Sequence, residues 1–449
     1  MNLRSLFLIG LLATGVARSQ TVLDAFNDPL LFSKNAMDIP SMQGLGFKHV
    51  SVTLPSLLAR AENNILTTGT LQDILLQSSL QQADIDKVVD GLEDQLYLGF
   101  DVKLQAIGVG FNLLRDDGTP WLSIGVEHQE RALFSMRLDQ EAIDLIYNGN
   151  RQFAGTNLVL DPLFARSLLY RSIGGNVALD LRVGGTDDLV IRPGIGVYAL
   201  TGMQGTGLDE TRLEMFTHAD GRAIDIRSDY DLNIAVPEDG NSILKGLGRG
   251  TALDVSVGVT IKKRLQLFAG VNDIGSLRFT EGVKNYRHSG FSTYDGVEVD
   301  YVDAYSTPNF QWDTLLTIVD PTETAEAFTL KLPTNLLFYG QFGLGSAQND
   351  AGTIFQHNLA LSVREGFGNT YFTRAPFTWT IGYTYQLADR ANFGFTLGDI
   401  HKGMPGIGLH STVRMGPVRL GVGSSNTIGW LAPNSNMGAD VRFLLQLTF

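Results

Sequence analysis

Apolar and polar residues alternate with a period of two along most of the chain after residue 95. In residues 253–261 and 377–387, every second side chain is aliphatic or aromatic, and those between are mainly small or polar. Because successive side chains of a strand point to opposite faces, the pattern predicts strands with one apolar face. We count about 14 such strands, with an acceptable range of 12 to 16.

Turn-forming residues join several of these predicted strands as hairpins. Residues 116–120 (DDGTP) separate a strand ending near Leu114 from one starting at Trp121. Residues 219–221 (ADG) and 387–390 (LADR) separate two further pairs. Asp, Gly and Pro favour tight turns, so these strands are expected to be antiparallel neighbours.

Residues 56–94 break the strand pattern, because their apolar positions recur at the spacing of a helix. We predict an amphipathic helical insert here, which is a candidate plug for a barrel lumen. Its apolar face comprises Leu71, Ile74, Leu75, Ile85, Val88, Val89 and Leu92. A shorter helix is predicted over Asp139–Tyr147. Residues 282–326, rich in Tyr, Asp and Ser, are too long for a tight turn and are interpreted as a surface excursion.

The alternation fits two architectures. In a soluble sandwich the apolar faces share a core, whereas in a membrane barrel they face lipid and the other faces line the lumen. Glycines on the non-apolar faces and aromatic residues near strand ends favour the barrel. The predicted fold class is therefore all-β: an antiparallel transmembrane outer-membrane β-barrel with a helical, plug-like insert.

The first 19 residues resemble a cleavable secretory signal. Arg4 precedes an apolar run from Leu6 to Val16, and Ala17-Arg18-Ser19 provides a small-x-small cleavage site. The run is too short to span ~30 Å of hydrocarbon. We predict a signal peptide at 1–19, a single barrel domain at 20–449, and a location in the cell outer membrane.

Composition and motifs narrow the function. The formal charge of −13 argues against nucleic acid as a partner. The seven histidines form no metal-binding motif, and no Gly-x-Ser-x-Gly nucleophile motif is present, so we expect no enzyme activity, catalytic residue, cofactor or metal. Two charged groups are weaker candidates: Glu127, Glu130 and Arg131 as lumen ion pairs, and an acidic patch as a rim cation site. That patch comprises Glu210, Glu214, Asp220, Asp225, Asp229 and Asp231.

The alternation continues to the last residue of the chain. Four apolar residues of one strand face lie at the terminus: Phe443, Leu445, Leu447 and Phe449. The final strand is therefore expected to belong to the barrel wall and to pair with the first strand, which removes both free edges.

Several stretches together resemble an uncharacterised family of Bacteroidota outer-membrane barrels, known only as domains of unknown function. They are residues 125–136, 138–155, 250–286 and 331–342, and the closing run Trp379–Phe449. The resemblance implies a turn at 271–275 (VNDIG) within a central hairpin, and a strand that follows Leu332-Pro333-Thr334. The family is distantly similar to barrels of the long-chain fatty-acid-transporter type and to the barrel accompanying the type 9 secretion system.

The resemblance also implies functions and partners. Outer-membrane lipids and the barrel-insertion machinery are expected partners, and the terminal Phe449 resembles the assembly signal that this machinery reads. Asp313-Thr314-Leu315 resembles an O-glycan acceptor, with Thr314 as the modified residue. The first functional hypothesis is a passive carrier of hydrophobic small molecules. The alternative is a structural or interaction barrel that serves a secretion, assembly or cell-surface machine with other cell-envelope proteins.

Overall fold

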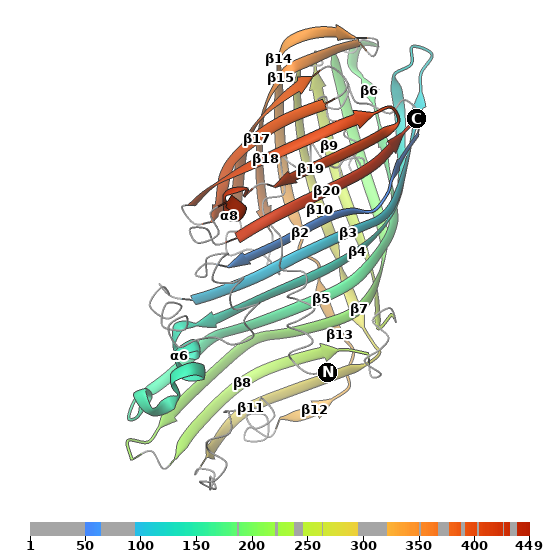
Figure 1. The fold of residues 1–449 in the computed structure, drawn as a ribbon. Coiled ribbons are helices and arrows are strands. Elements are labelled where there is room, and N and C mark those ends of the chain that lie inside the picture. Colours follow the sequence, from blue (N-terminus) through green and yellow to red (C-terminus); the bar gives the residue numbers. More distant parts are fainter. Residues whose placement is uncertain are drawn as a thin grey trace.

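Antiparallel strands dominate the fold (Figure 1). A computed structural model describes residues 50–63, 95–185, 188–220, 223–237, 246–262, 264–294, 321–349, 352–366, 377–387, 391–401, 404–424, 426–431 and 438–449. The predicted signal peptide, the seven candidate plug residues and Thr314 lie outside these ranges.

The strands have the following bounds. The first ten are β1 (Val50–Thr53), β2 (Ser56–Asn63), β3 (Gln95–Leu114), β4 (Pro120–Asp139), β5 (Asn157–Leu179), β6 (Leu181–Arg182), β7 (Leu189–Thr217), β8 (Ile224–Ala235), β9 (Gly248–Ile261) and β10 (Leu265–Phe279). The others are β11 (Val283–Tyr294), β12 (Thr322–Thr324), β13 (Phe328–Lys331), β14 (Asn335–Asn349), β15 (Gly352–Gly366), β16 (Phe377–Leu387), β17 (Ala391–His401), β18 (Met404–Met415), β19 (Val418–Ser424) and β20 (Gly438–Thr448).

These segments form a closed antiparallel barrel of 14 strands, as the sequence predicted. Several barrel strands are interrupted, so that two or three segments follow one another along a single line of the wall. β1 and β2 both pair with β3 and β20, and β8 and β9 both pair with β7. β10 continues as β11, and β12, β13 and β14 together form the next line of the wall.

The two ends of the described chain close the barrel. Ser51 is opposite Thr448 in the β1–β20 ladder. The Phe449 N–H donates to the Val50 carbonyl at 2.9 Å, and the Val50 N–H donates to the Phe449 carbonyl at 3.3 Å. The final strand is thus a paired part of the wall, and the sandwich alternative is wrong.

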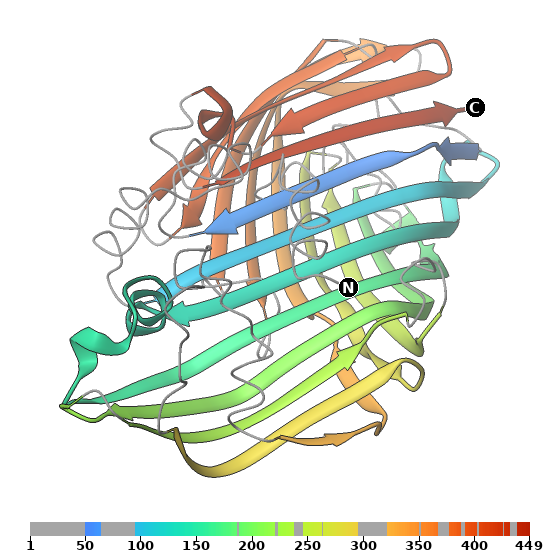
Figure 2. The same cartoon turned by 60° about the horizontal axis from the view of Figure 1, so that its bottom comes forward.

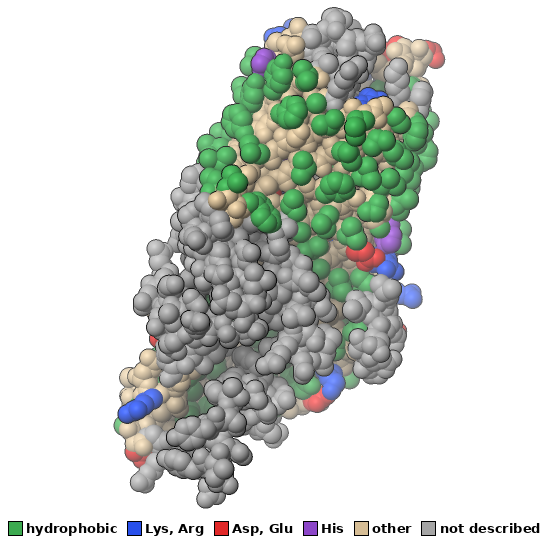
Figure 3. Space-filling view, in the orientation of Figure 1, with side chains coloured by type: hydrophobic (Ala, Val, Ile, Leu, Met, Phe, Trp, Pro, Cys, Tyr) green, Lys and Arg blue, Asp and Glu red, His purple; other side chains and the backbone are tan. Residues whose placement is uncertain are grey.

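The two faces of the wall differ in chemistry as the alternation predicted. On β20, Phe443 is 46% exposed on the outside, whereas Arg442 and Gln446 are buried on the lumen side. The same division holds on β17, where Phe393 and Phe395 are half exposed. Figure 3 shows the resulting apolar band on the outer surface. No helix among the described residues is long and apolar enough to cross a membrane.

The wall is much taller on one side than on the other (Figures 1 and 2). β7 has 29 residues and β5 has 23, whereas β19 has seven. A tilted transmembrane strand needs about 9–11 residues. The tall side therefore extends well beyond the apolar band. We call the part formed by β8, β11, β12 and the adjoining ends of β3, β4, β5 and β7, at the bottom of Figure 1, the extension.

Helices are short and lie at the end of the barrel with the longer connections. α6 (Gln140–Asn148) confirms the predicted helix, and Asp139 is its N-cap residue. Its apolar side packs with the extension, where Ala142 is buried beside Leu158 and Met215. Two 3-10 turns, η2 (Asn150–Phe153) and η3 (Val183–Gly185), and α8 (Ile428–Leu431) complete the regular elements.

Three sequence interpretations need correction. Residues 56–63 are not helical but form β2, because they complete the barrel strand begun by β1. The excursion predicted at 282–326 contains β11, which pairs with β8 along its whole length, and the short β12. Residues 271–275 are not a hairpin turn: they lie within β10, where the ladder with β9 shifts between Val271 and Ile274. The hairpins at 116–120 and 219–221 are confirmed.

Candidate functional site across the barrel lumen

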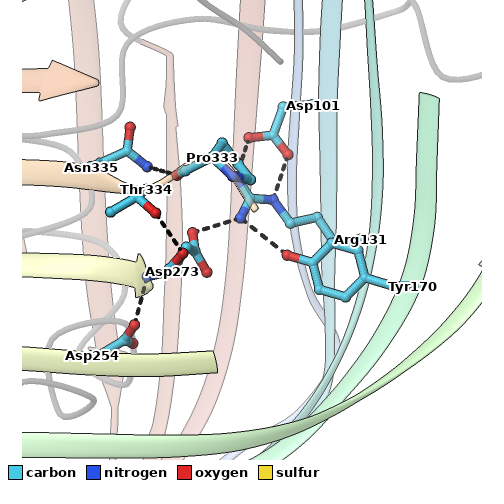
Figure 4. Close-up of polar contacts among 8 residues, drawn as sticks. All are labelled: Asp101, Arg131, Tyr170, Asp254, Asp273, Pro333, Thr334 and Asn335. Carbon is cyan, nitrogen blue, oxygen red and sulfur yellow. Dashed lines mark hydrogen bonds and ion pairs between the residues drawn. The ribbon is translucent and has the colours of Figure 1, made fainter. Parts of the chain in front are cut away.

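A charged cluster inside the barrel is centred on Arg131 of β4 (Figure 4). Arg131 Nε donates to Asp101 Oδ1 at 3.0 Å, and its Nη2 donates to Oδ2 at 2.9 Å. The register of β3 and β4 places Arg131 opposite Lys103, so Asp101 is its diagonal neighbour on the same face. Both side chains are largely shielded from solvent, with 9% and 2% of their surfaces exposed.

The second contact of Arg131 crosses the lumen. Its Nη1 lies 2.9 Å from Asp273 Oδ2 and 3.3 Å from the Tyr170 hydroxyl. Asp273 belongs to β10, and β5, β7 and β9 separate β10 from β4 along the wall. The ion pair therefore connects two parts of the wall that three intervening strands separate. We call Asp101, Arg131, Tyr170 and Asp273 the lumen cluster.

A local backbone feature positions Asp273. Its φ is 59°, a left-handed conformation that Asp adopts more readily than most residues, and it lies in the β10 bulge. The Asp273 N–H donates to Asp254 Oδ1 at 2.8 Å, and the Thr334 hydroxyl donates to the Asp273 carbonyl at 2.9 Å. The bulge thus interrupts the strict alternation and directs this carboxylate toward Arg131.

The charge balance of the cluster is negative. Arg131 faces two carboxylates directly, and Asp254 supports the second through its backbone. Removing one partner from a buried pair commonly destabilises a protein by about 3–5 kcal/mol, because a desolvated charge remains. The cluster therefore links β3, β4 and β10 through charged side chains.

An apolar layer lies on the lumen side of the wall beside this cluster. We call it the waist cluster, and its members are Leu133, Leu168, Tyr170, Tyr198, Leu200, Ala235, Leu247, Ala252, Leu277, Phe279, Leu330 and Leu332. Phe279 is fully buried and stacks on Phe328 with ring centroids 5.3 Å apart. A Cβ on Gly205 would lie 2.6 Å from the Phe279 ring, so glycine there makes space for the ring.

The waist cluster coincides with the interruptions of the wall. β8 ends at Ala235 and β9 begins at Gly248, while both strands pair with β7. The Leu247 N–H donates to the Gly202 carbonyl at 2.7 Å, and the Thr280 N–H donates to the Leu247 carbonyl at 3.0 Å. These hydrogen bonds connect neighbouring strands at the breaks. Apolar side chains cover the inner surface of the wall there.

Elsewhere the lumen surface is mainly polar. On the shorter wall, Gln386 and Asn392 are opposite each other on β16 and β17 and are buried. Neither side-chain amide has a hydrogen-bond partner in the described part of the chain. Since a buried amide without a partner costs free energy, water is the expected partner for both groups.

The structure separates the charged residues that the sequence grouped together. Glu127 and Arg131 face the lumen, but Glu130 faces outward and pairs with Arg171 at 2.6 Å. The acidic patch also divides, because Asp225 pairs with His218 and Asp231 pairs with Arg287. Hydrogen bonds from Thr293 and His218 lower the pKa of Asp225. Among the described residues, no three potential metal ligands form a group.

Sequence reasoning did not identify Asp101, Tyr170 or Asp273 as functional. A charged residue on the lumen face of an otherwise alternating strand was the available signal for Asp101. No local signal connects Asp273 to Arg131, because the two residues are 142 positions apart. The predicted terminal residues Phe443, Leu445, Leu447 and Phe449 lie on the closing strand β20, which the β1 and β2 segments separate from β3.

Comparisons with known proteins identify a family and several solved structures of low sequence identity. A profile described as "Family of unknown function (DUF5723)" matches residues 40–425. No curated protein matches the chain. The solved structures that match include the Ralstonia pickettii toluene transporter TbuX, with 10% identity and a TM-score of 0.40, covering 92% of this chain and 95% of that one.

A Pseudomonas aeruginosa FadL homologue matches with 10% identity and a TM-score of 0.38, covering 91% of each chain. The translocator domain of the Neisseria meningitidis autotransporter NalP matches with 8% identity and a TM-score of 0.32, covering 89% of this chain and 88% of that one. These neighbours are outer-membrane barrels. Scores this low do not extend their activities to this chain.

Proposed function

Because the chain belongs to the family of unknown function DUF5723, whose description assigns no activity, we propose from its geometry that it is a passive outer-membrane carrier of small hydrophobic molecules. In this proposal the chain is exported by a signal peptide that is cleaved before Gln20. The barrel then spans the outer membrane through its exterior apolar band.

The waist cluster is the observation that carries the proposal. It is a cluster of twelve buried side chains, mostly apolar, on the lumen side of a barrel whose lumen face elsewhere is mainly polar. A hydrophobic molecule gains about 25 cal/mol for each Å² of apolar surface that it removes from water. Within the described lumen, such a molecule would therefore bind most favourably at this layer.

Passage would require local movement. The cluster members are at most 5% exposed, and the Arg131–Asp273 pair crosses the lumen beside them. These contacts favour a carrier that opens transiently over a permanently open aqueous pore. Low conductance of the wild-type protein in planar bilayers is the corresponding expectation.

Binding can be tested with Phe279→Ala, which removes a buried ring from the waist cluster. A dry apolar cavity of this kind accepts small aromatic molecules. We expect tighter binding of a toluene probe by Phe279→Ala, measured by ligand-observed NMR in detergent. Leu409→Ala is the matched control, because Leu409 is 52% exposed on the outer face.

Transport needs a separate test in proteoliposomes. We expect faster toluene entry with the wild-type protein than with empty vesicles, and a further change with Phe279→Ala. Native protein that carries no apolar molecule by mass spectrometry, together with toluene entry equal to that of empty vesicles, would exclude the carrier. Heat-modifiable migration on gels checks that each variant is folded.

The extension favours a second candidate, an interaction barrel of the cell envelope. It is formed on one side of the barrel only (Figure 2) and carries exposed charged side chains such as Arg227 and Asp229. Charged, one-sided surfaces suit transient protein contacts. Crosslinking in intact cells that yields only the monomer would argue against this candidate.

A further inference from the structure

A row of polar side chains, four of them charged, marks the limit of the exterior apolar band toward the extension, on the tall side of the barrel. The row runs across adjacent strands through Glu130, Arg171, Thr201, Arg249 and Arg278, which are successive partners in the ladders. From this row toward the end of β9 at Ile261, the outward residues Leu253, Val255, Val257, Val259 and Ile261 are all apolar.

The row contains one neutralised part and one uncompensated part. Arg171 lies 2.6 Å from Glu130, so its charge is balanced within the wall. Arg249 and Arg278 are directly opposite each other on β9 and β10, and both are exposed. Neither has an ion pair or side-chain hydrogen bond within the described parts of the chain. Like charges in directly opposed positions destabilise a sheet, and a bound anion would offset the repulsion between these two.

Lys331 adds a third cation to this group. It is exposed on β13, two residues from Thr329, which is opposite Arg278. Diagonal neighbours of this kind have Cβ atoms roughly 7–8 Å apart, within reach of long side chains. Lys331 likewise has no ion-pair partner among the described residues. Three flexible cations thus lie close together at the limit of the apolar band toward the extension.

The orientation of the barrel identifies the leaflet. Outer-membrane barrels have short turns on the periplasmic side and longer connections outside. Here Phe449 and the short turns at 115–119 and 416–417 lie at one end, and the basic group lies toward the other, where α6 and the extension are found. The group is therefore at the headgroup level of the outer leaflet.

We propose that Arg249, Arg278 and Lys331 bind the phosphate-bearing headgroup of an outer-leaflet lipid, whose acyl chains lie along the apolar face of β9 and β10. Arginine and lysine are well suited to phosphate, and basic groups at a membrane surface recognise anionic lipids. This site is on the outside of the wall and does not depend on the proposed carrier function.

The test is native mass spectrometry of the full-length protein with dioleoyl phosphatidic acid and, separately, dioleoyl phosphatidylcholine. We expect preferential retention of phosphatidic acid, reduced about fivefold for each cation that is replaced in Arg249→Gln, Arg278→Gln and Lys331→Gln. Arg227→Gln is the control, since Arg227 is an exposed arginine on the other face of the extension and has no ion-pair partner among the residues that the structure describes.

Each outcome decides the proposal. The triple variant combines Arg249→Gln, Arg278→Gln and Lys331→Gln. Loss of phosphatidic acid in this variant but not in Arg227→Gln supports the site, provided that both proteins keep heat-modifiable migration. Equal retention of phosphatidic acid by the wild type, the triple variant and Arg227→Gln contradicts the proposal. Equal retention of phosphatidic acid and phosphatidylcholine contradicts it as well. Complete displacement of the lipid by 10 mM inorganic phosphate would show a free-anion site instead and would also overturn the lipid assignment.

Discussion

The guanidinium of Arg131 links two carboxylates that come from distant parts of the chain. Asp101 is buried beside it, and Asp273 approaches from the other side of the lumen. Such a group is constrained more by its partners than by its own strand. Its contribution is best measured by removing the charge while retaining the length of the side chain.

Arg131→Met should lower the free energy of unfolding by about 3 kcal/mol, because Asp101 would remain desolvated without its partner. The measurement is a urea unfolding curve in detergent. A double variant, Arg131→Met with Asp101→Asn, should recover part of the loss. If the single variant unfolds at the wild-type midpoint, the cluster does not stabilise the barrel.

Gly205 makes a complementary prediction about packing. A valine there would place Cβ 2.6 Å from the buried Phe279 ring, in a layer with no free volume to receive it. We expect Gly205→Val to destabilise the protein by about 1–3 kcal/mol or more. Adding Phe279→Leu should relieve part of the clash, and thermal unfolding of the two variants would detect this.

At the scale of elements, the alternating pattern identified most strands but not their interruptions. The breaks between β8 and β9 and between β10 and β11 depend on backbone bonds to neighbouring strands, such as that from Val236 N–H to the Gly282 carbonyl. The family resemblance implied a turn at 271–275, where the structure has the β10 bulge, and Asn and Asp favour positive φ in both settings. Only pairing with β9 and β14 distinguishes the two.

The β3–β4 hairpin turn allows a pH prediction. Hydrogen bonds from Arg182 and Thr119 lower the pKa of Asp117, which is exposed outside the membrane-spanning segments. A lowered carboxyl pKa stabilises the folded turn above the ordinary value of 3.8, and this contribution is lost as the pH falls below it. Asp117→Asn should therefore speed amide exchange of Thr119 at pH 6. At sufficiently low pH, where Asp117 is protonated, the variant and wild type should converge.

At the scale of the whole molecule, closure depends on the last strand. Phe449 exchanges backbone hydrogen bonds with Val50, and β20 completes the wall between β19 and the first strand. Phe449→Asp, or deletion of 443–449, should therefore block assembly, because both edges would be left open or charged. Normal heat-modifiable, membrane-inserted protein from either variant would contradict this, and Met415→Asp at the exposed end of β18 is the control.

The sequence by itself determined the strand period, the apolar exterior, the strand number and the terminal strand, because these follow from local alternation and from turn residues. It also located α6 correctly. The tertiary structure decided which side chains meet across the lumen. Arg131 meets Asp273 only because the wall curves and closes, and β2 is a strand only because β3 and β20 flank it. Local patterns encode the face of a residue, whereas contacts across a barrel depend on closure of the entire wall.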